Sequence, residues 1–234
     1  MSTNFTSVKS VYKPAIGLGA YSVPDIALIL GRSQANVRRL INDVWDERLG
    51  RKMFGDGFSI TIDGQKFVNF HVFIELLVYL ELRKLKVSAQ RIIKTRNAMR
   101  KDLNTEHPFA MAKVLAHSKK IWYELEDSIV DANGTRQTNF ERMVQDYAKK
   151  IDFDAADLAK RYWPLGKDRH IVVDPLHQFG MPTIAGTNIN THTILSMFRS
   201  GETTEVLADM FGISINAVRD ALDLHGREMP AKAA

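Results

Sequence analysis

A short run of polar residues near the N-terminus has the composition and spacing of a surface that can bind nucleic acid. Val37, Leu40 and Ile41 recur at helical spacing and would face inward. The opposite face carries hydroxyl, amide and guanidinium groups, on Ser33, Gln34, Asn36, Arg38 and Arg39. Amide and guanidinium groups form paired hydrogen bonds with base edges in the major groove. The pattern therefore predicts that this face contacts duplex DNA.

The surrounding residues predict a helix-turn-helix over positions 21–48. Ser22 is a suitable N-cap for the first helix, and Asp25 would complement the positive end of its dipole. Gly31 would end that helix, and Ser33 would cap the second one. Pairs of short amphipathic helices also occur in helical domains that bind no nucleic acid. The segment that follows helps to distinguish a DNA-binding helix-turn-helix from such a domain.

A β-hairpin is predicted directly after these helices. Residues 58–62 alternate as a strand, Asp63 and Gly64 form a type I′ turn signal, and residues 65–69 supply the returning strand. Helix, turn, helix and hairpin follow one another in a winged helix-turn-helix. Basic residues at or before the hairpin could reach the flanking phosphates: Arg48, Arg51, Lys52 and Lys66.

Two longer helices are predicted next. Residues 70–85 are apolar on most sides, so another element or another subunit must cover them. Ser88 would cap an amphipathic helix over residues 89–103. Its outward residues are expected to be Lys94, Arg96, Arg100 and Lys101. This face could be a second basic edge, a strut between two protomers or a solvated surface, and a dimer would suit a two-fold operator.

The middle of the chain is less informative. We expect a hairpin over residues 121–130 and a helix over residues 141–150. Asp152, Asp154 and Asp157 lack the spacing of a calcium loop, so we expect them to cap and solvate the start of a helix.

The last third predicts a strand over residues 170–173 and three capped helices, a second helix-turn-helix-like unit. The first of these helices covers residues 191–199, the second is capped by Thr203 or Thr204, and the third by Ser214. The inner face of the second helix is expected to be Val206, Leu207, Met210 and Phe211. The outward residues of the third are expected to be Asn216, Arg219, Asp220 and Asp223. Their mixed charge suits a protein partner as well as DNA.

Charge is divided unevenly along the chain. Residues 1–120 carry 20 basic and 10 acidic side chains, whereas residues 121–234 carry 12 and 17. A basic first half suits a polyanion, and an acidic second half suits a basic protein partner.

The composition disfavours several classes of protein. The absence of cysteine excludes disulfides, thiolate catalysis and cysteine-bound zinc. The 7 histidines have no metal-binding spacing, and neither a dinucleotide loop nor a serine nucleophile elbow is present. The apolar run 70–82 is too short to span a bilayer, and the N-terminus lacks the apolar segment of a signal peptide. We therefore expect a cytoplasmic protein that is not an enzyme and needs no cofactor or metal.

The segment GMPTIAGTNI resembles the core of a small domain of unknown function found in VapB-type antitoxins. The matching positions are Gly180, Pro182, Ile184, Gly186, Thr187 and Ile189. Asn188 stands where that family usually has arginine. The opening YSVPDIALILGRS and the helix VNFHVFIELLVYLELRK are similar to longer members of this group, which carry an N-terminal winged helix.

This resemblance implies an antitoxin of a type II toxin–antitoxin module. Such a protein neutralises a cognate toxin, typically a PIN-like ribonuclease, by binding it, and represses its own operon. The implied partners are operator double-stranded DNA, the toxin and a second copy of the chain. The C-terminal motif would consist of Gly180, Pro182, Gly186, Thr187, Asn188, Asn216 and Arg219. The alternative is a MerR-like transcriptional regulator with a small-molecule effector domain.

The sequence as a whole predicts a mainly α protein with small β-hairpins, an α+β fold in three parts. Residues 1–105 would form the winged helix-turn-helix with dimerisation helices, and residues 106–168 a connecting α/β segment. Residues 169–234 would form the antitoxin-type helical domain and tail. Whether this last part contacts DNA or protein, and whether its folded unit or its tail holds the toxin, stays open.

Overall fold

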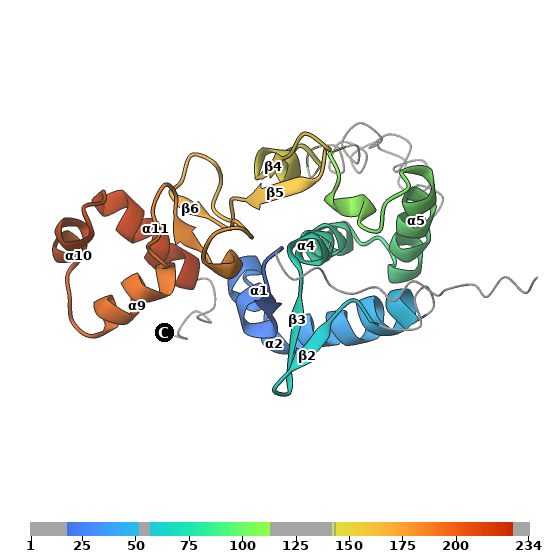
Figure 1. The fold of residues 1–234 in the computed structure, drawn as a ribbon, viewed down its shortest axis with the longest axis horizontal. Coiled ribbons are helices and arrows are strands. Elements are labelled where there is room, and N and C mark those ends of the chain that lie inside the picture. The colour runs from blue at the N-terminus through green and yellow to red at the C-terminus, as the bar shows by residue number, and fades with distance from the viewer. Residues whose placement is uncertain (1–17, 52–56, 113–141, 143, 227–234) are drawn as a thin grey trace, which may run out of the picture.

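The chain has a mixed α+β fold in which helices alternate with small antiparallel sheets (Figure 1). This computed structural model describes residues 18–51, 57–112, 142 and 144–226. The hairpin expected over residues 121–130 lies outside that part of the chain. Among the helices of the described ranges, none combines the length and apolar character needed to cross a membrane.

Helices lie at both ends of the long axis of the molecule, and three further helices lie between them (Figure 1). Helices α9 (Thr191–Arg199), α10 (Thr204–Phe211) and α11 (Ile215–Gly226) lie at one end of the long axis, and α5 (Ala89–Asp102) lies at the other (Figure 1). Between them lie α1 (Val23–Leu30), α2 (Gln34–Leu40) and α4 (Phe70–Lys84).

The first two helices begin and end as their capping residues predict. Ser22 and Asp25 form a capping box, in which the Asp25 carboxylate accepts the backbone N–H of Ser22 at 2.9 Å. Gly31 ends α1 with a φ of 58°, and the Ser33 hydroxyl accepts the backbone N–H of Asn36 at 3.4 Å. Helix α2 continues directly into the π-helix η1 (Ile41–Arg51). One continuous helical segment therefore presents the polar face identified from the sequence.

The predicted hairpin is present and gains a third strand. β2 (Ile60–Ile62) and β3 (Gln65–Val68) are joined by Asp63 and Gly64, with φ values of 49° and 76°, as a type I′ turn requires. β1 (Tyr21–Ser22), which the sequence did not predict, pairs with the other edge of β3. The three-stranded sheet thereby ties the start of α1 to the start of α4.

Helix α4 is the centre of the larger hydrophobic core, and other elements of the same chain cover it. Trp45 of η1 contacts Tyr79 edge to face, with ring centroids 5.4 Å apart. Phe73 stacks on Tyr21 at 5.1 Å and meets the Tyr162 ring at 5.7 Å. The prediction that this apolar helix must be covered is therefore confirmed.

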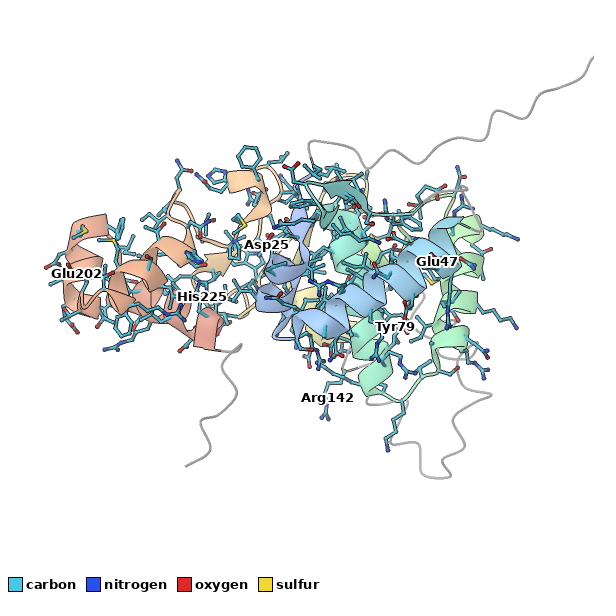
Figure 2. All side chains as sticks on the ribbon, turned by 90° about the horizontal axis from the view of Figure 1, so that it is seen from below. Asp25, Glu47, Tyr79, Arg142, Glu202 and His225 are labelled. Carbon is cyan, nitrogen blue, oxygen red and sulfur yellow. The ribbon has the colours of Figure 1, made fainter. Side chains whose placement is uncertain are left out.

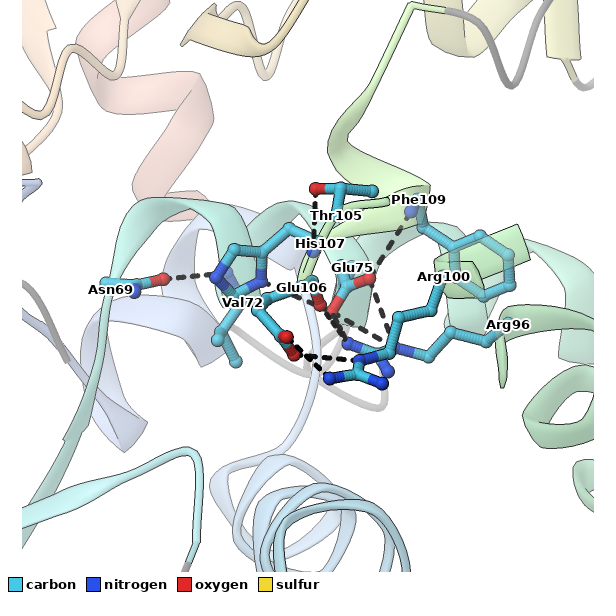
Figure 3. Close-up of polar contacts among 9 residues, drawn as sticks. All are labelled: Asn69, Val72, Glu75, Arg96, Arg100, Thr105, Glu106, His107 and Phe109. Atoms are coloured by element: carbon cyan, nitrogen blue, oxygen red, sulfur yellow. Dashed lines mark hydrogen bonds and ion pairs between the residues drawn. The ribbon is translucent and has the colours of Figure 1, made fainter. Parts of the chain in front are cut away.

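The prediction that Arg96 faces solvent is wrong. Its guanidinium is 1% exposed and makes a bidentate ion pair with Glu75 of α4, whose side chain is fully buried (Figure 3). The backbone N–H of Phe109, in the short helix η2 (Pro108–Ala110), donates to the same carboxylate at 3.3 Å. Burial alone would raise the pKa of Glu75, but Arg96 and His107 together lower it. Arg96 turns inward because a carboxylate buried among apolar side chains needs a cation.

The three aspartates at 152–157 belong to a hairpin, so the prediction that they start a helix is wrong. β4 (Ile151–Phe153) and β5 (Ala159–Tyr162) pair antiparallel. The Asp154 carboxylate accepts the backbone N–H groups of Ala156 and Leu158, both at 2.9 Å, and so shapes the turn between the strands. Of the helix expected over residues 141–150, the described positions 142 and 144–149 are helical.

The C-terminal unit has a second hydrophobic core. It contains β6 (Ile171–Val172), the turn η3 (Gln178–Gly180) and β7 (Thr183–Ile184), followed by α9, α10 and α11. Thr203 caps α10, and the Ser214 hydroxyl accepts the backbone N–H of Ala217 at 3.1 Å. Leu28 of α1 is part of this second cluster. The C-terminal unit therefore packs directly on the first helix.

Two predictions about side-chain orientation in this unit are wrong. Val206 and Met210 of α10 are 43% and 55% exposed, whereas Leu207 and Ala208 are buried. Asp220 of α11 is 4% exposed instead of pointing outward. Its carboxylate is held by Arg169 and by the backbone N–H of His170, which come from the segment before β6.

Candidate nucleic-acid interface

The polar face of α2 lies at the surface. Five side chains of this face are exposed, namely Ser33, Gln34, Asn36, Arg38 and Arg39, while Val37 and Leu40 are buried beneath them. The hydrophobic contacts of α2 with α1 and η1 hold this face in place. Amide and guanidinium groups are thus displayed together on a supported helix, which is the arrangement needed to read base edges.

The hairpin of β2 and β3 is anchored by Asp46 of η1. Its carboxylate accepts the backbone N–H groups of Phe58 and Ser59 and pairs with the Lys66 ammonium at 2.6 Å. Lys66 therefore holds β3 against η1, and the Asp46 carboxylate partly neutralises the charge of the Lys66 ammonium. Arg51 is the last residue of η1, and Lys52 lies outside the described residues.

A basic groove separates α2 and η1 from the C-terminal half of α4. Its volume is about 430 Å³. Its polar and charged lining residues are Arg32, Asn36, Arg39, Asp43, Arg48, Tyr79, Arg83 and Lys84. The apolar residues Leu40, Val44, Leu80 and Ala89 complete the lining. In sequence these residues are scattered over some fifty positions. Only the packing of η1 on α4 brings them together, so Arg32, Arg83 and Lys84 carried no signal in the sequence that could place them at the site.

The motif GMPTIAGTNI forms a tight loop at the edge of the C-terminal unit. Gly186 has a φ of 75°, and the Thr187 hydroxyl donates to the Ile184 carbonyl at 2.8 Å and accepts the Ile189 N–H at 3.1 Å. Gly180 has a φ of 89° and sits against the buried ring of Tyr21. Most of the motif is therefore explained by the folding of the loop.

Other motif residues are available to a partner. Asn188 at the loop and Asn216 and Arg219 on α11 are exposed, whereas Pro182 is buried. The structure does not gather the exposed ones at α2. However, Pro182 and Gln34 line the same cavity of about 490 Å³ between the N-terminal helices and the C-terminal unit. Figure 2 labels Asp25 and His225, which line this cavity from the two sides.

The C-terminal unit also exposes an apolar stripe with acidic neighbours. Val206 and Met210 lie four residues apart on α10, so they share a face. Glu205 and Asp209, each one position earlier, are exposed beside them. Phe198 of α9 is 43% exposed. Apolar surface rimmed by charge is typical of protein-binding sites.

Ionisable groups in the C-terminal unit brace the fold. Burial alone would raise the pKa of Asp220, but hydrogen bonds from Arg169 and His170 lower it. The ring of His225 contacts the Thr191 hydroxyl at 3.1 Å, and burial lowers its pKa to about 4. In the described ranges, no group of three or more acidic or histidine side chains is placed to hold a metal ion.

Comparisons with known proteins point to antitoxin-like relatives. The family model described as "Protein of unknown function (DUF433)" matches residues 171–224, which is the C-terminal unit. A Mycobacterium tuberculosis protein named "Putative antitoxin VapB45" is 32% identical over 85 residues, covering 36% of this chain and 36% of that protein. The chain thus spans about a third of the length of that relative.

The fold itself has a solved counterpart. The crystal structure of Rv2018 from Mycobacterium tuberculosis superposes with a TM-score of 0.68 and 20% identity, and covers 91% of this chain and 100% of that one. This similarity shows that the two proteins share a fold. The resemblance to an antitoxin comes from the sequence, and it is confined to the 85 residues that match the putative antitoxin.

Proposed function

We propose that this protein is an antitoxin that represses its own operon through α2 and binds a toxin through its C-terminal unit. In this proposal the winged helix-turn-helix lies within residues 1–105, and the toxin-binding part lies within residues 169–234. The toxin would be a PIN-like ribonuclease encoded beside the gene. The protein would act in the cytoplasm as a homodimer, which would present two copies of α2 to a two-fold operator.

The observation that carries the DNA-binding half is the exposed polar face of α2. Its arginine and amide side chains are supported from below by Val37 and Leu40. The hairpin of β2 and β3 is held on η1, the helix that continues α2. Helix-turn-helix proteins read DNA with the second helix, which is the position of α2 here.

The toxin-binding half is supported by the stripe on α10. Val206 and Met210 offer apolar contact area, and the neighbouring Glu205 and Asp209 would meet basic side chains of the partner. An exposed apolar pair on a helix that also packs a core suits a protein partner better than a phosphate backbone.

Two surface variants test the two halves separately. Arg38→Ala/Arg39→Ala should weaken binding to the protein's own promoter duplex, because each lost base contact costs about 1–3 kcal/mol. Val206→Ser/Met210→Ser should retain promoter binding and lose capture and silencing of the neighbouring toxin. Each variant is the control for the other, because all four residues are exposed or half-exposed on separate helices. An arginine variant that shifts the promoter as the parent does would refute the DNA-binding half.

A ligand-responsive, MerR-like regulator is the second candidate. The cavity lined by Gln34, Pro182 and His225 has a volume of about 490 Å³, within the range of small-molecule sites. A small molecule there would contact both α2 and the C-terminal unit. Native mass spectrometry that finds a bound metabolite, together with the absence of a neighbouring toxin gene, would favour this candidate.

A further inference from the structure

The basic groove beside α2 carries more positive charge than its own residues neutralise. Its lining includes four arginines and Lys84 against the carboxylate of Asp43. Lys84 pairs with Glu81 at 2.5 Å, and Arg83 donates to the Val87 carbonyl at 2.7 Å.

The other three arginines of the groove differ from Lys84 and Arg83 in their contacts. In the part of the chain that the structure describes, Arg32, Arg39 and Arg48 form no ion pair with a carboxylate. Unpaired guanidinium groups that converge on one groove repel one another, and an anion bound there would relieve that repulsion.

Tyr79 of α4 lines the groove. Its side chain, labelled in Figure 2, is 6% exposed. Its ring contacts Trp45 edge to face. Burial raises the pKa of Tyr79, and the positive charges of Arg83, Arg48 and Arg39 act against that rise. The same three arginines line the groove together with Tyr79.

We infer that this groove binds the sugar-phosphate backbone of the duplex whose major groove receives α2. Asn36 and Arg39 belong both to the polar face of α2 and to the lining of the groove, so the two surfaces are continuous. A duplex docked on α2 would therefore lay a neighbouring backbone strand against Arg32 and Arg48. This inference rests on the proposed DNA-binding function and adds to it a phosphate site formed by Arg32, which precedes α2, and Arg48 of η1.

Guanidinium groups are suited to this ligand. They donate two parallel hydrogen bonds to phosphate oxygens, and each phosphate neutralised releases condensed counterions. The affinity for duplex DNA then falls with salt, with a slope of about 0.9 in log K per log salt for each contact. Loss of two such contacts should lower the slope by about 2, for specific and non-specific DNA alike.

The test compares two double variants with the same loss of charge. Arg32→Gln/Arg48→Gln removes two groove cations, while Lys94→Gln/Lys101→Gln removes two exposed cations of α5 that do not line the groove. Binding of the full chain to a promoter duplex and to a scrambled duplex of equal length is measured from about 50 to about 200 mM salt. We expect the groove variant to lose about 2 from both slopes and the α5 variant to change little. Arg32→Lys/Arg48→Lys, which keeps the charge, should retain most of the slope.

Several outcomes separate this inference from the proposed function. If the groove variant and the α5 variant bind duplex DNA with the same salt slope, the phosphate site is refuted. The proposal that α2 contacts the operator bases is not affected by that result. If the parent protein binds the promoter and the scrambled duplex with equal affinity, operator recognition is refuted. A salt slope that is reduced only in the groove variant would still support the phosphate site in that case. A third outcome is that inorganic phosphate or AMP binds in a way that depends on Arg32 and Arg48, while the salt slope for duplex DNA is the same in the groove variant and the parent. This outcome would refute the duplex backbone as the ligand of the groove. Absence of duplex binding by the parent overturns both proposals.

Discussion

Two buried histidines should make the folded protein lose stability between about pH 6.5 and pH 4. His71 of α4 is 6% exposed and His225 of α11 is 7% exposed. Burial, and then the neighbouring His107 for the first and His192 for the second, lowers the pKa of each ring from 6.5 to about 4. Both rings are therefore neutral in the folded protein at a pH at which the unfolded chain is protonated.

The size of the effect follows from proton linkage. Below pH 6.5 the unfolded state binds more protons than the folded state, so the free energy of unfolding decreases as the pH falls and levels off below about pH 4. Between pH 7 and pH 5 each histidine contributes a loss of about 2 kcal/mol, or about 4 kcal/mol for both. Such a loss is a large part of the free energy of unfolding of a folded domain, which is usually about 5–15 kcal/mol. The carboxyl groups with lowered pKa titrate at lower pH and add little in this window; they are Glu75, Asp152, Glu205 and Asp220.

Urea unfolding followed by circular dichroism at both pH values measures this loss. His71→Gln and His225→Gln should each lower the difference between pH 7 and pH 5 by about 2 kcal/mol. His177→Gln is the matched control, because that histidine is exposed and should leave the difference unchanged. A parent protein with the same unfolding free energy at both pH values would refute the reasoning, and so would a His71 variant that keeps the full acid-dependent loss.

Three further substitutions test single contacts through urea unfolding at pH 7. Arg96→Met should cost about 3–5 kcal/mol because it leaves the Glu75 carboxylate buried without a cation, and adding Glu75→Gln should recover part of that loss. Gly180→Ala should cost about 2–4 kcal/mol, because the residue has a φ of 89° and its new methyl group would meet Tyr21. Ser33→Ala should cost about 1 kcal/mol through loss of the cap on α2, and an unchanged midpoint would contradict that role.

Elements whose signals lie close together in sequence were predicted well. The caps at Ser22, Ser33 and Ser214 and the turn at Asp63 and Gly64 are each made by residues within a few positions of the backbone groups they bind. For these, local periodicity and capping chemistry suffice, because the interaction that fixes the element is itself local.

Features that depend on distant partners were missed. β1 is two residues long and exists only because β3, some forty-five positions later, offers a free edge. Arg96 was assigned to solvent because the pattern of α5 contains no sign of Glu75, which lies 21 positions away. Asp220 was misplaced for the same reason, since Arg169 is 51 positions earlier. A carboxylate inside the apolar run of α4 was the single sequence signal that a buried cation had to exist.

The same argument applied to α10 bears on function. Periodicity predicts Val206 and Met210 in the core, yet the core there is filled by Leu207 and Ala208, while Val206 and Met210 remain at the surface. The exposure removes the stabilisation that their burial would supply, about 1.5–3 kcal/mol for each side chain. Places where a local pattern and the fold disagree in this way are expected where a surface is kept for a partner. The mismatch on α10 therefore supports a protein-binding role for the C-terminal unit, independently of any similarity to known antitoxins.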